Sequence, residues 1–484
     1  MAALVSPEQR REIETVVSEW VREDGVPGAS VAVVDPDGLA YAEGFGARDR
    51  AANAPATPDT LYGIGSCTKS VTAVALLQLA EAGDVSLDDP VADYLPHLAD
   101  APGDPVTLHE LLCHSSGMPS DGTLSALITR LTDRGDRDPD LPMTGDGDFR
   151  RHVEASVDER LVGGDHFFYY NTGYTLLGKV VEEVTGESYA EYVRRDIHDP
   201  LGMDRSCFSR AAFEAADDRM TAYNREAVDG DDDAVDAVEA SLAFDERLYA
   251  PGGMMSSVAE MANYLRLYLD GASERGVGEA DANQRGAFEG ERLLAPESVA
   301  RMTERHATRE EYLDERAQGY GYGLSATEFL DDTLVGHGGM MGTTTAWFGY
   351  LQDANIGVVT ACNTAPERHP SAVGKAVLAL VRDAAPHEVV PTYAFERKAE
   401  PLVGEYASHR EVRTATVERA GAGLRIEFDD PGWSGEYRVV PETMDPDDHR
   451  YYVVTETGKR VPAEFRVGDD DVSLLLQRWR LHKQ

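Results

Sequence analysis

Two spacings of hydrophobic residues alternate along this chain and divide it into elements. Residues 7–24 place apolar side chains three and four positions apart after a Ser6-Pro7 start, which predicts an amphipathic helix. Residues 30–34 and 39–42 are apolar runs on either side of the turn residues 35–38, which is typical of a β-hairpin. The chain is therefore predicted to begin with one helix and two antiparallel strands.

Helical spacing dominates from residue 66 to residue 270, and strand patterns return after it. The predicted helices include 71–82, 174–185 and 258–269. Later strands are predicted at 333–335, 343–350 and 356–361, followed by a last helix at 372–381. Strands on both sides of a helical insert predict an α/β domain over residues 1–385, with an antiparallel sheet flanked by helices.

The remaining segments differ in composition. Residues 226–246 and 272–292 are rich in Asp, Glu, Gly and Ala with weak periodicity, so we predict surface loops or acidic insertions there. Residues 386–398 lie in a proline-containing stretch and are predicted to be a linker. Alternating apolar residues within 399–484, such as Leu424, Ile426 and Phe428, predict a small all-β C-terminal domain.

The charge of the chain narrows the classes of partner. Its 484 residues carry 45 Lys and Arg against 87 Asp and Glu, a formal net charge of −42, so no nucleic-acid partner is expected. At roughly 1 M salt the Debye length falls to about 3 Å and screens the self-repulsion. We therefore predict a halophilic protein from a salt-rich cytosol, and an ordinary acidic protein from a mesophile is the alternative.

The sequence indicates neither a leader nor a membrane segment. Its first residues lack the basic and apolar regions of a signal peptide, and no apolar run has the length of a membrane span. The four cysteines are scattered without metal-ligand spacing, as expected of reduced thiols. A cytoplasmic protein with no membrane partner, no cofactor and no catalytic metal is predicted.

Ser66 and Lys69 are the first candidates for chemistry. They precede an apolar helical run, so Ser66 is expected near a helix N-terminus with Lys69 on the same face. A serine hydroxyl becomes a nucleophile when a neighbour accepts its proton, and a partly buried lysine can do so. A capping serine followed by an exposed lysine is the structural alternative, but none of the other five lysines has a serine three positions earlier.

Tyr169 and Asn171 are the second pair of candidates. They lie two residues apart in an aromatic cluster just before a predicted helix, so their side chains can point the same way. The phenol of Tyr169 could transfer a proton, and the amide of Asn171 could orient a substrate carbonyl. The structural alternative is a set of core aromatic residues with an asparagine cap.

His337 and the glycines around it form the third candidate. Gly336, Gly338 and Gly339 allow a substrate backbone to approach the strand edge closely. The imidazole of His337 could donate a hydrogen bond to a substrate or to the tyrosine oxygen. A turn histidine in a glycine-rich hairpin is the structural alternative.

Together these elements resemble the serine β-lactamase and penicillin-binding-protein superfamily, in the branch of class C β-lactamases, esterases and D-aminopeptidases. The resemblance covers roughly residues 8–383. The Ser-x-x-Lys, Tyr-x-Asn and Lys/His-x-Gly motifs of that family fall here on Ser66 and Lys69, Tyr169 and Asn171, and His337 and Gly339. The stretches 111–118 and 251–257 also look like this branch, and the C-terminal segment is similar to the lipocalin-like barrel of some of its D-amino-acid peptidases.

The resemblance implies a mechanism. Ser66 would form an acyl-enzyme, Lys69 and Tyr169 would move protons, and Asn171 would bind the substrate amide. The oxyanion hole would consist of the backbone N–H groups of Ser66 and Met340, so Met340 joins His337 and Gly339 among the expected substrate-binding residues.

Two departures from the family bear on substrate choice. His337-Gly338-Gly339 replaces the Lys-Thr-Gly of β-lactamases, so the cation and hydroxyl that bind a β-lactam carboxylate are missing. Tyr170 replaces a small residue between Tyr169 and Asn171. We expect a hydrolase of small amides or short peptides, including D-amino-acid peptides, that forms a homo-oligomer. A carboxylesterase, a weak β-lactamase, or a non-catalytic binding or scaffold protein are the alternatives.

Overall fold

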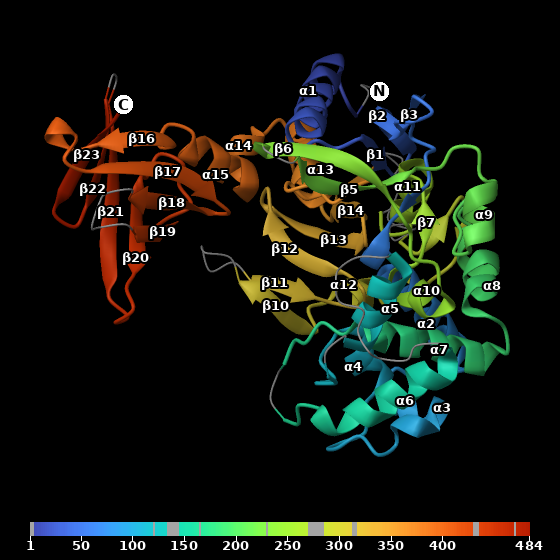
Figure 1. The fold of residues 1–484 in the computed structure, drawn as a ribbon. Helices are drawn as coiled ribbons and strands as arrows, with labels where there is room; N and C mark the ends of the chain where they lie inside the picture. The colour runs from blue at the N-terminus through green and yellow to red at the C-terminus, as the bar shows by residue number, and fades with distance from the viewer. Residues whose placement is uncertain are drawn as a thin grey trace. The chain divides into compact units, whose positions relative to one another are not determined.

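Figure 1 shows the computed structural model of the protein, which consists of two compact units. It describes residues 4–119, 122–132, 145–163, 166–228, 231–269, 285–311, 317–428, 435–468 and 471–484. Among the described residues, the first unit contains those up to Glu310 and from Ala317 to Val381, and the second contains Glu311 and those from Arg382 to Gln484.

A nine-stranded sheet forms the centre of the first unit, in the order β10-β11-β12-β13-β14-β15-β1-β2-β3. The pairings from β11 through β15 and β1 to β3 are antiparallel, as predicted. Because β1 pairs with β15, the first and last strands of the unit lie side by side. The strands are β1 (Gly28–Asp35), β2 (Gly38–Asp49), β3 (Ala54–Pro55), β10 (Ala307–Glu311), β11 (Ala317–Tyr320), β12 (Ser325–Phe329), β13 (Asp332–Met341), β14 (Thr344–Leu351) and β15 (Ile356–Cys362).

The predicted helical insert between the strands is present. Its helices α2, α7 and α11 coincide within a few residues with the three predicted ones, and α2 and α7 end at glycines in the left-handed conformation. The helices of the first unit are α1 (Pro7–Glu23), α2 (Thr68–Ala82), α3 (Val91–Tyr94), α4 (Leu108–Leu112), α5 (Gly122–Thr132), α6 (Asp146–Ser156), α7 (Asn171–Thr185), α8 (Tyr189–Val193), α9 (Arg210–Ala215), α10 (Glu246–Gly252), α11 (Val258–Arg266), α12 (Pro296–Thr303) and α13 (Pro370–Val381).

Helices cover both faces of the sheet. Trp347 and Phe348 are neighbours on β14, so their side chains point to opposite faces. The Trp347 ring lies against Gly374 of α13, while the Phe348 ring lies 6.0 Å from that of Tyr264 in α11. Helix α13, with α1 beside it, therefore packs on one face and α11 on the other (Figure 1).

Helix α2 is buried on all sides. Every residue from Thr68 to Leu77 is buried, and the helix contacts α7 and α10. A helix that is apolar all round belongs in a protein core. Lys69 is the charged residue in this stretch, and with an exposed fraction of 0% it requires polar partners.

Part of the segment 226–246, predicted to be a surface loop or an acidic insertion, is not a loop. Most of this segment belongs to an antiparallel hairpin of β5 (Ala222–Val228) and β6 (Asp231–Ala240). In its register Ala222 pairs with Ala240. Backbone pairing and the buried ring of Tyr223 stabilise it, and neither depends on an apolar alternation. In the other segment, 272–292, residues 272–284 lie outside the described residues, and short strands β8 (Ala287–Phe288) and β9 (Glu291–Arg292) follow.

The second unit contains a closed eight-stranded barrel, which agrees with the predicted all-β C-terminal domain. Apolar side chains fill its interior, among them Tyr406, Phe465 and Leu474, and the rings of Tyr406 and Phe465 lie 6.1 Å apart. The strands are β16 (Gly404–Ala407), β17 (Thr414–Ala420), β18 (Gly423–Phe428), β19 (Gly435–Pro441), β20 (Arg450–Val454), β21 (Arg460–Val467), β22 (Val472–Leu476) and β23 (Trp479–Lys483).

Two helices occupy the stretch predicted to be a linker. They are α14 (Pro386–Val389) and α15 (Pro391–Ala399), each beginning at a proline in its first turn. Lys398 of α15 donates hydrogen bonds to the carbonyl oxygens of Thr443 and Asp445, which fixes the helix against the barrel. Among the helices of the described residues, none combines the length and the apolar character needed to span a bilayer.

Candidate active site

Ser66 lies in a 3-10 turn, Gly65–Cys67, directly before α2. Gly65 has a φ of 54°, a left-handed conformation that suits glycine, and its carbonyl oxygen accepts a hydrogen bond from Thr68 Oγ1 at 2.7 Å. Lys69 lies three residues after Ser66, in the first turn of α2. Its Nζ donates a hydrogen bond to Ser66 Oγ at 3.0 Å. The first predicted pair is therefore brought into direct contact.

Lys69 also joins the second motif to the first. Its Nζ donates to Asn171 Oδ1 at 2.5 Å and to the carbonyl oxygen of Pro251 at 2.7 Å. Asn171 is the first residue of α7, and Pro251 lies near the end of α10. Three helices that are far apart in sequence therefore converge on one buried amine.

Tyr169 lies over the same amine. Lys69 Nζ is 4.9 Å from the centroid of its ring, and the guanidinium carbon of Arg309 on β10 is 5.6 Å from that centroid. Arg309 is about one-third exposed, with its Nε 3.7 Å from Glu310 Oε1. The phenol of Tyr169 therefore lies beside two cations, one buried and one at the surface.

His337 is buried in β13, with an exposed fraction of 3%. Its Nδ1 lies 2.5 Å from the Gly338 carbonyl oxygen and its Nε2 lies 3.0 Å from the hydroxyl of Tyr320. Burial and the charges of Lys69 and Arg309 lower the pKa of His337 to about 3, so the imidazole is neutral. Both ring nitrogens thus have partners within the protein, and the tyrosine hydroxyl that His337 contacts is that of Tyr320.

The backbone of β13 lies directly against the Ser66 turn. A Cβ atom added to Gly339 would overlap the carbonyl oxygen of Ile64 and lie 2.7 Å from the backbone nitrogen of Ser66. One added to Gly65 would overlap the backbone nitrogen of Met340. The N–H groups of Ser66 and Met340 therefore lie close together, while the Met340 side chain is exposed.

Sequence reasoning missed three neighbours of these motifs. Arg309 lies in a charged stretch that looks like a solvated surface, and Tyr320 lacks a motif of its own. Pro251 contributes only a carbonyl oxygen, which every residue has. The Tyr-Gly-Tyr-Gly pattern at 320–323 was an available signal for Tyr320, since aromatic side chains often line a site, and Pro251 lies in the stretch 251–257 that already resembled the family.

The charges around the site are unusual for this chain. The charges that act most strongly on the imidazoles of His337 and His114 are those of cations, with Lys69 first among them. The chain as a whole has a formal net charge of −42. A positive centre in a strongly negative protein favours an anionic group on the molecule that binds there.

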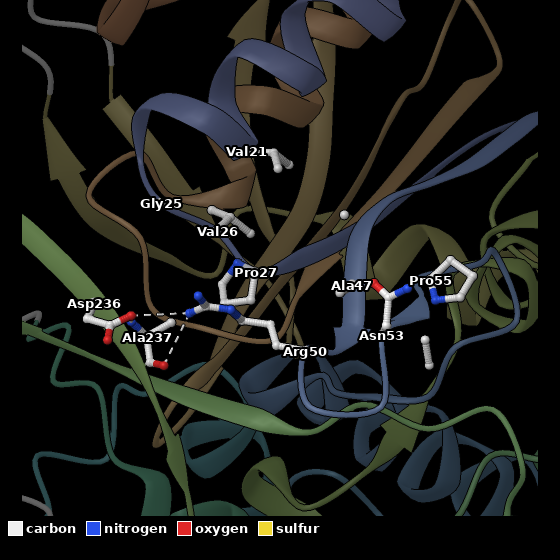
Figure 2. Close-up of a pocket in the computed structure, with 12 residues that line it drawn as sticks. Val21, Gly25, Val26, Pro27, Ala47, Arg50, Asn53, Pro55, Asp236 and Ala237 are labelled. Atoms are coloured by element: carbon white, nitrogen blue, oxygen red, sulfur yellow. Dashed lines mark hydrogen bonds and ion pairs between the residues drawn. The ribbon is translucent and has the colours of Figure 1, made fainter.

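A separate hollow of about 790 Å³ lies on the first unit, between the end of α1, the β2–β3 edge and β6 (Figure 2). Arg50 lines it and forms an ion pair with Asp236 at 3.3 Å. None of the predicted site residues lines this hollow. It therefore has no part in the chemistry considered below.

Comparison with known proteins now decides the family. Residues 13–382 match the family model described as Beta-lactamase. The chain belongs to the beta-lactamase family. Residues 386–482, outside the beta-lactamase region, match the model described as Pab87 octamerisation domain.

Several relatives of this beta-lactamase family member cover much of its length. The octameric penicillin-binding protein homologue from Pyrococcus abyssi is 32% identical, with a TM-score of 0.85 over 98% of this chain and 100% of that one. Penicillin-binding protein 4 of Amycolatopsis lactamdurans is 30% identical over 353 residues, 71% of this chain and 81% of that protein. Protein flp of Staphylococcus aureus is 27% identical over 54% of this chain, which spans only about half (49%) of flp.

Proposed function

We propose that this protein is a serine hydrolase that forms an acyl-enzyme on small amide or peptide substrates. The observation that carries the proposal is the hydrogen bond of 3.0 Å between Lys69 Nζ and Ser66 Oγ. A nucleophile within hydrogen-bond reach of a base that a third group orients is the arrangement that nucleophilic catalysis requires. Here Asn171 and the Pro251 carbonyl orient the base.

The reaction proceeds in two halves. Lys69, in its neutral form, accepts the proton of Ser66 Oγ as that oxygen bonds to the substrate carbonyl carbon. The C–N bond then breaks, and the leaving amine takes up the proton through Tyr169, whose ring lies 4.9 Å from the amine of Lys69. Water attacks the ester in the second half, releasing the acid and returning the proton to Ser66.

Two backbone N–H groups bind the negative oxygen that develops during each attack. They are those of Ser66 and Met340, which the contact between the Ser66 turn and β13 brings close together. Since His337 is buried and bonded to Tyr320, we assign it to holding β13 in place rather than to contacting the substrate.

Arg309 is proposed to bind a carboxylate on the substrate. The third motif lacks the cation and hydroxyl of the β-lactamases, whereas the guanidinium of Arg309 lies beside Tyr169 and is partly exposed. A guanidinium pairs well with a carboxylate. Short peptides with a free C-terminal carboxylate are therefore the preferred substrates.

Labelling tests the nucleophile. With a fluorescent fluorophosphonate in about 2 M KCl, where charge repulsion is screened, the wild type is expected to be labelled and Ser66→Ala is not. Ser70→Ala, which removes a buried serine bonded to the Cys67 carbonyl oxygen, is the matched control and should remain labelled. Labelling that persists in Ser66→Ala, or is absent from the wild type, would favour the non-catalytic alternative.

A substrate panel tests the substrate class. We expect turnover of L- or D-aminoacyl peptides, and Arg309→Gln should raise KM about tenfold for a peptide with a free carboxylate but not for its C-terminal amide. The panel also contains p-nitrophenyl esters and nitrocefin. If only esters react the protein is a carboxylesterase, and rapid nitrocefin hydrolysis would make it a β-lactamase.

We further propose a homo-oligomer assembled through the second unit. The match of residues 386–482 to an octamerisation domain supports this, as does the octameric homologue at 32% identity. Light scattering in about 2 M KCl, a salt level that screens the charge, should give a mass several times that of one chain. The mass of a single chain across the concentration range would contradict the proposal.

A further inference from the structure

His114 lies outside the three motifs, in the loop that follows α4. Its side chain is buried, with an exposed fraction of 1%, and its φ of 60° is in the left-handed region. A non-glycine residue in this conformation is uncommon, and histidine and asparagine tolerate it better than most. The position is therefore one that the surrounding structure has to hold in place.

Two hydrogen bonds connect His114 to the residues on either side of Tyr169. The backbone N–H of Phe168 donates to the His114 carbonyl oxygen at 2.8 Å. The backbone N–H of Tyr170 donates to His114 Nδ1 at 3.1 Å. One residue thus fixes the backbone both before and after the tyrosine.

The imidazole of His114 also contacts the tyrosine ring itself. The two ring centroids are 4.3 Å apart with an angle of 40° between the planes. Tyr174 and Tyr320 surround the imidazole further, at 5.2 and 5.0 Å between centroids. Backbone and ring contacts together leave Tyr169 little freedom to move.

The hydrogen-bond pattern fixes the protonation state of His114. Because Nδ1 accepts from Tyr170, the ring proton lies on Nε2, a buried atom with no hydrogen-bond partner among the described residues. Burial, and after it the charges of Lys69 and Arg309, keep the pKa of His114 well below 6.5. A buried donor without a partner lowers stability, so the Nε2–H group of His114 is a cost that the hydrogen bond accepted from Tyr170 has to offset.

We propose that His114 is a positioning residue that holds the phenol of Tyr169 over Lys69 and Ser66. The proposal rests on the proposed function, because it assigns His114 a role in the proton transfer by Tyr169. His114 touches neither the substrate nor the nucleophile. Its effect is on the geometry of a group that has to lie within hydrogen-bond reach in the transition state.

Two amide variants separate the positioning role from simple packing. In His114→Asn the Oδ1 atom can replace Nδ1 as the acceptor for Tyr170, and asparagine tolerates the positive φ. In His114→Gln the acceptor moves to the ε position and that bond is lost. We expect His114→Gln to lower kcat by about 10- to 100-fold with little change in KM, and His114→Asn to retain most of kcat.

The control is His198, which is equally buried and also has an Nε2 without a partner among the described residues. Its ring stacks on Phe208 at 5.9 Å, and it contacts none of the motifs. His198→Gln should change the melting temperature as much as His114→Gln does, but leave kcat unaltered. Equal losses of kcat in the two variants would show a general effect of burial and overturn the proposal.

A double mutant provides the decisive readout. If His114 acts through Tyr169, adding His114→Gln to Tyr169→Phe should cost no further activity, since the group that it positions is already gone. Additive losses would overturn the proposal. A wild type without Ser66-dependent turnover would instead refute the proposed function, whereas an active wild type with full kcat in His114→Gln would refute only the role of His114.

Discussion

Replacing Lys69 by methionine is expected to lower kcat/KM by about 10³-fold or more. Lys69 Nζ is the base within reach of Ser66 Oγ, at 3.0 Å, and the side chain is completely buried. Methionine has a similar length and no charge, so the core around α2 should stay filled. The measurement is hydrolysis of a p-nitrophenyl ester and of a short peptide in about 2 M KCl, where charge repulsion is screened.

Lys179→Met is the control for that result. Lys179 is a partly exposed lysine on α7 whose amine pairs with Glu182 at 3.0 Å. Loss of a surface ion pair changes stability little, so this variant should keep its activity. Near-normal acylation in Lys69→Met, with the serine still labelled, would mean that another group accepts the proton.

Replacing Gly339 by alanine should have the second largest effect, a loss of about 10²- to 10³-fold in kcat. The new methyl group would overlap the carbonyl oxygen of Ile64 and lie 2.7 Å from the nitrogen of Ser66. These are backbone atoms, which cannot move aside as a flexible side chain can. The strand β13 and the Ser66 turn would therefore have to move apart. The N–H groups of Ser66 and Met340 would then no longer bind the same oxyanion.

The neighbouring variant Gly338→Ala tests the geometry of this contact. A methyl group there would lie 3.1 Å from Cε1 of His369, which is a side-chain atom and can shift. Its activity should fall far less than that of Gly339→Ala, as measured by the rate of acylation with the same ester. Equal losses in the two variants would show that the strand tolerates no substitution, and would remove the evidence for an oxyanion site at Ser66 and Met340.

The local parts of the site could be predicted from helix geometry, whereas long-range contacts such as that between Ser66 and Met340 could be expected only from the family resemblance. The spacing of Ser66 and Lys69 on one helix places the two side chains together by helix geometry alone. The contact of Asn171 with Lys69 joins residues 102 positions apart. Periodicity contains no information on which distant residues meet, so the sequence predicted a substrate-binding role for Asn171 but did not predict its contact with Lys69.

The same limit explains the other differences. His337 was expected to donate a hydrogen bond to a substrate or to the oxygen of Tyr169, and its Nε2 instead lies 3.0 Å from the hydroxyl of Tyr320 on β11. The β5–β6 hairpin has an acidic sequence in which backbone pairing outweighs composition. The predicted linker, residues 386–398, contains the helices α14 and α15. Its prolines, Pro386 and Pro391, are the first residues of these two helices.

The burial of α2 links catalysis to the unfolding of the whole first unit. A helix with every residue from Thr68 to Leu77 buried opens only when the core around it opens, because local fluctuations are confined to exposed and weakly packed segments. If the protein needs salt to fold, as its charge predicts, the proposed nucleophile and base would be among the last groups to lose their geometry as salt is withdrawn. Under that prediction, the activity that remains after dilution from high salt would report the fraction of the protein that is still folded.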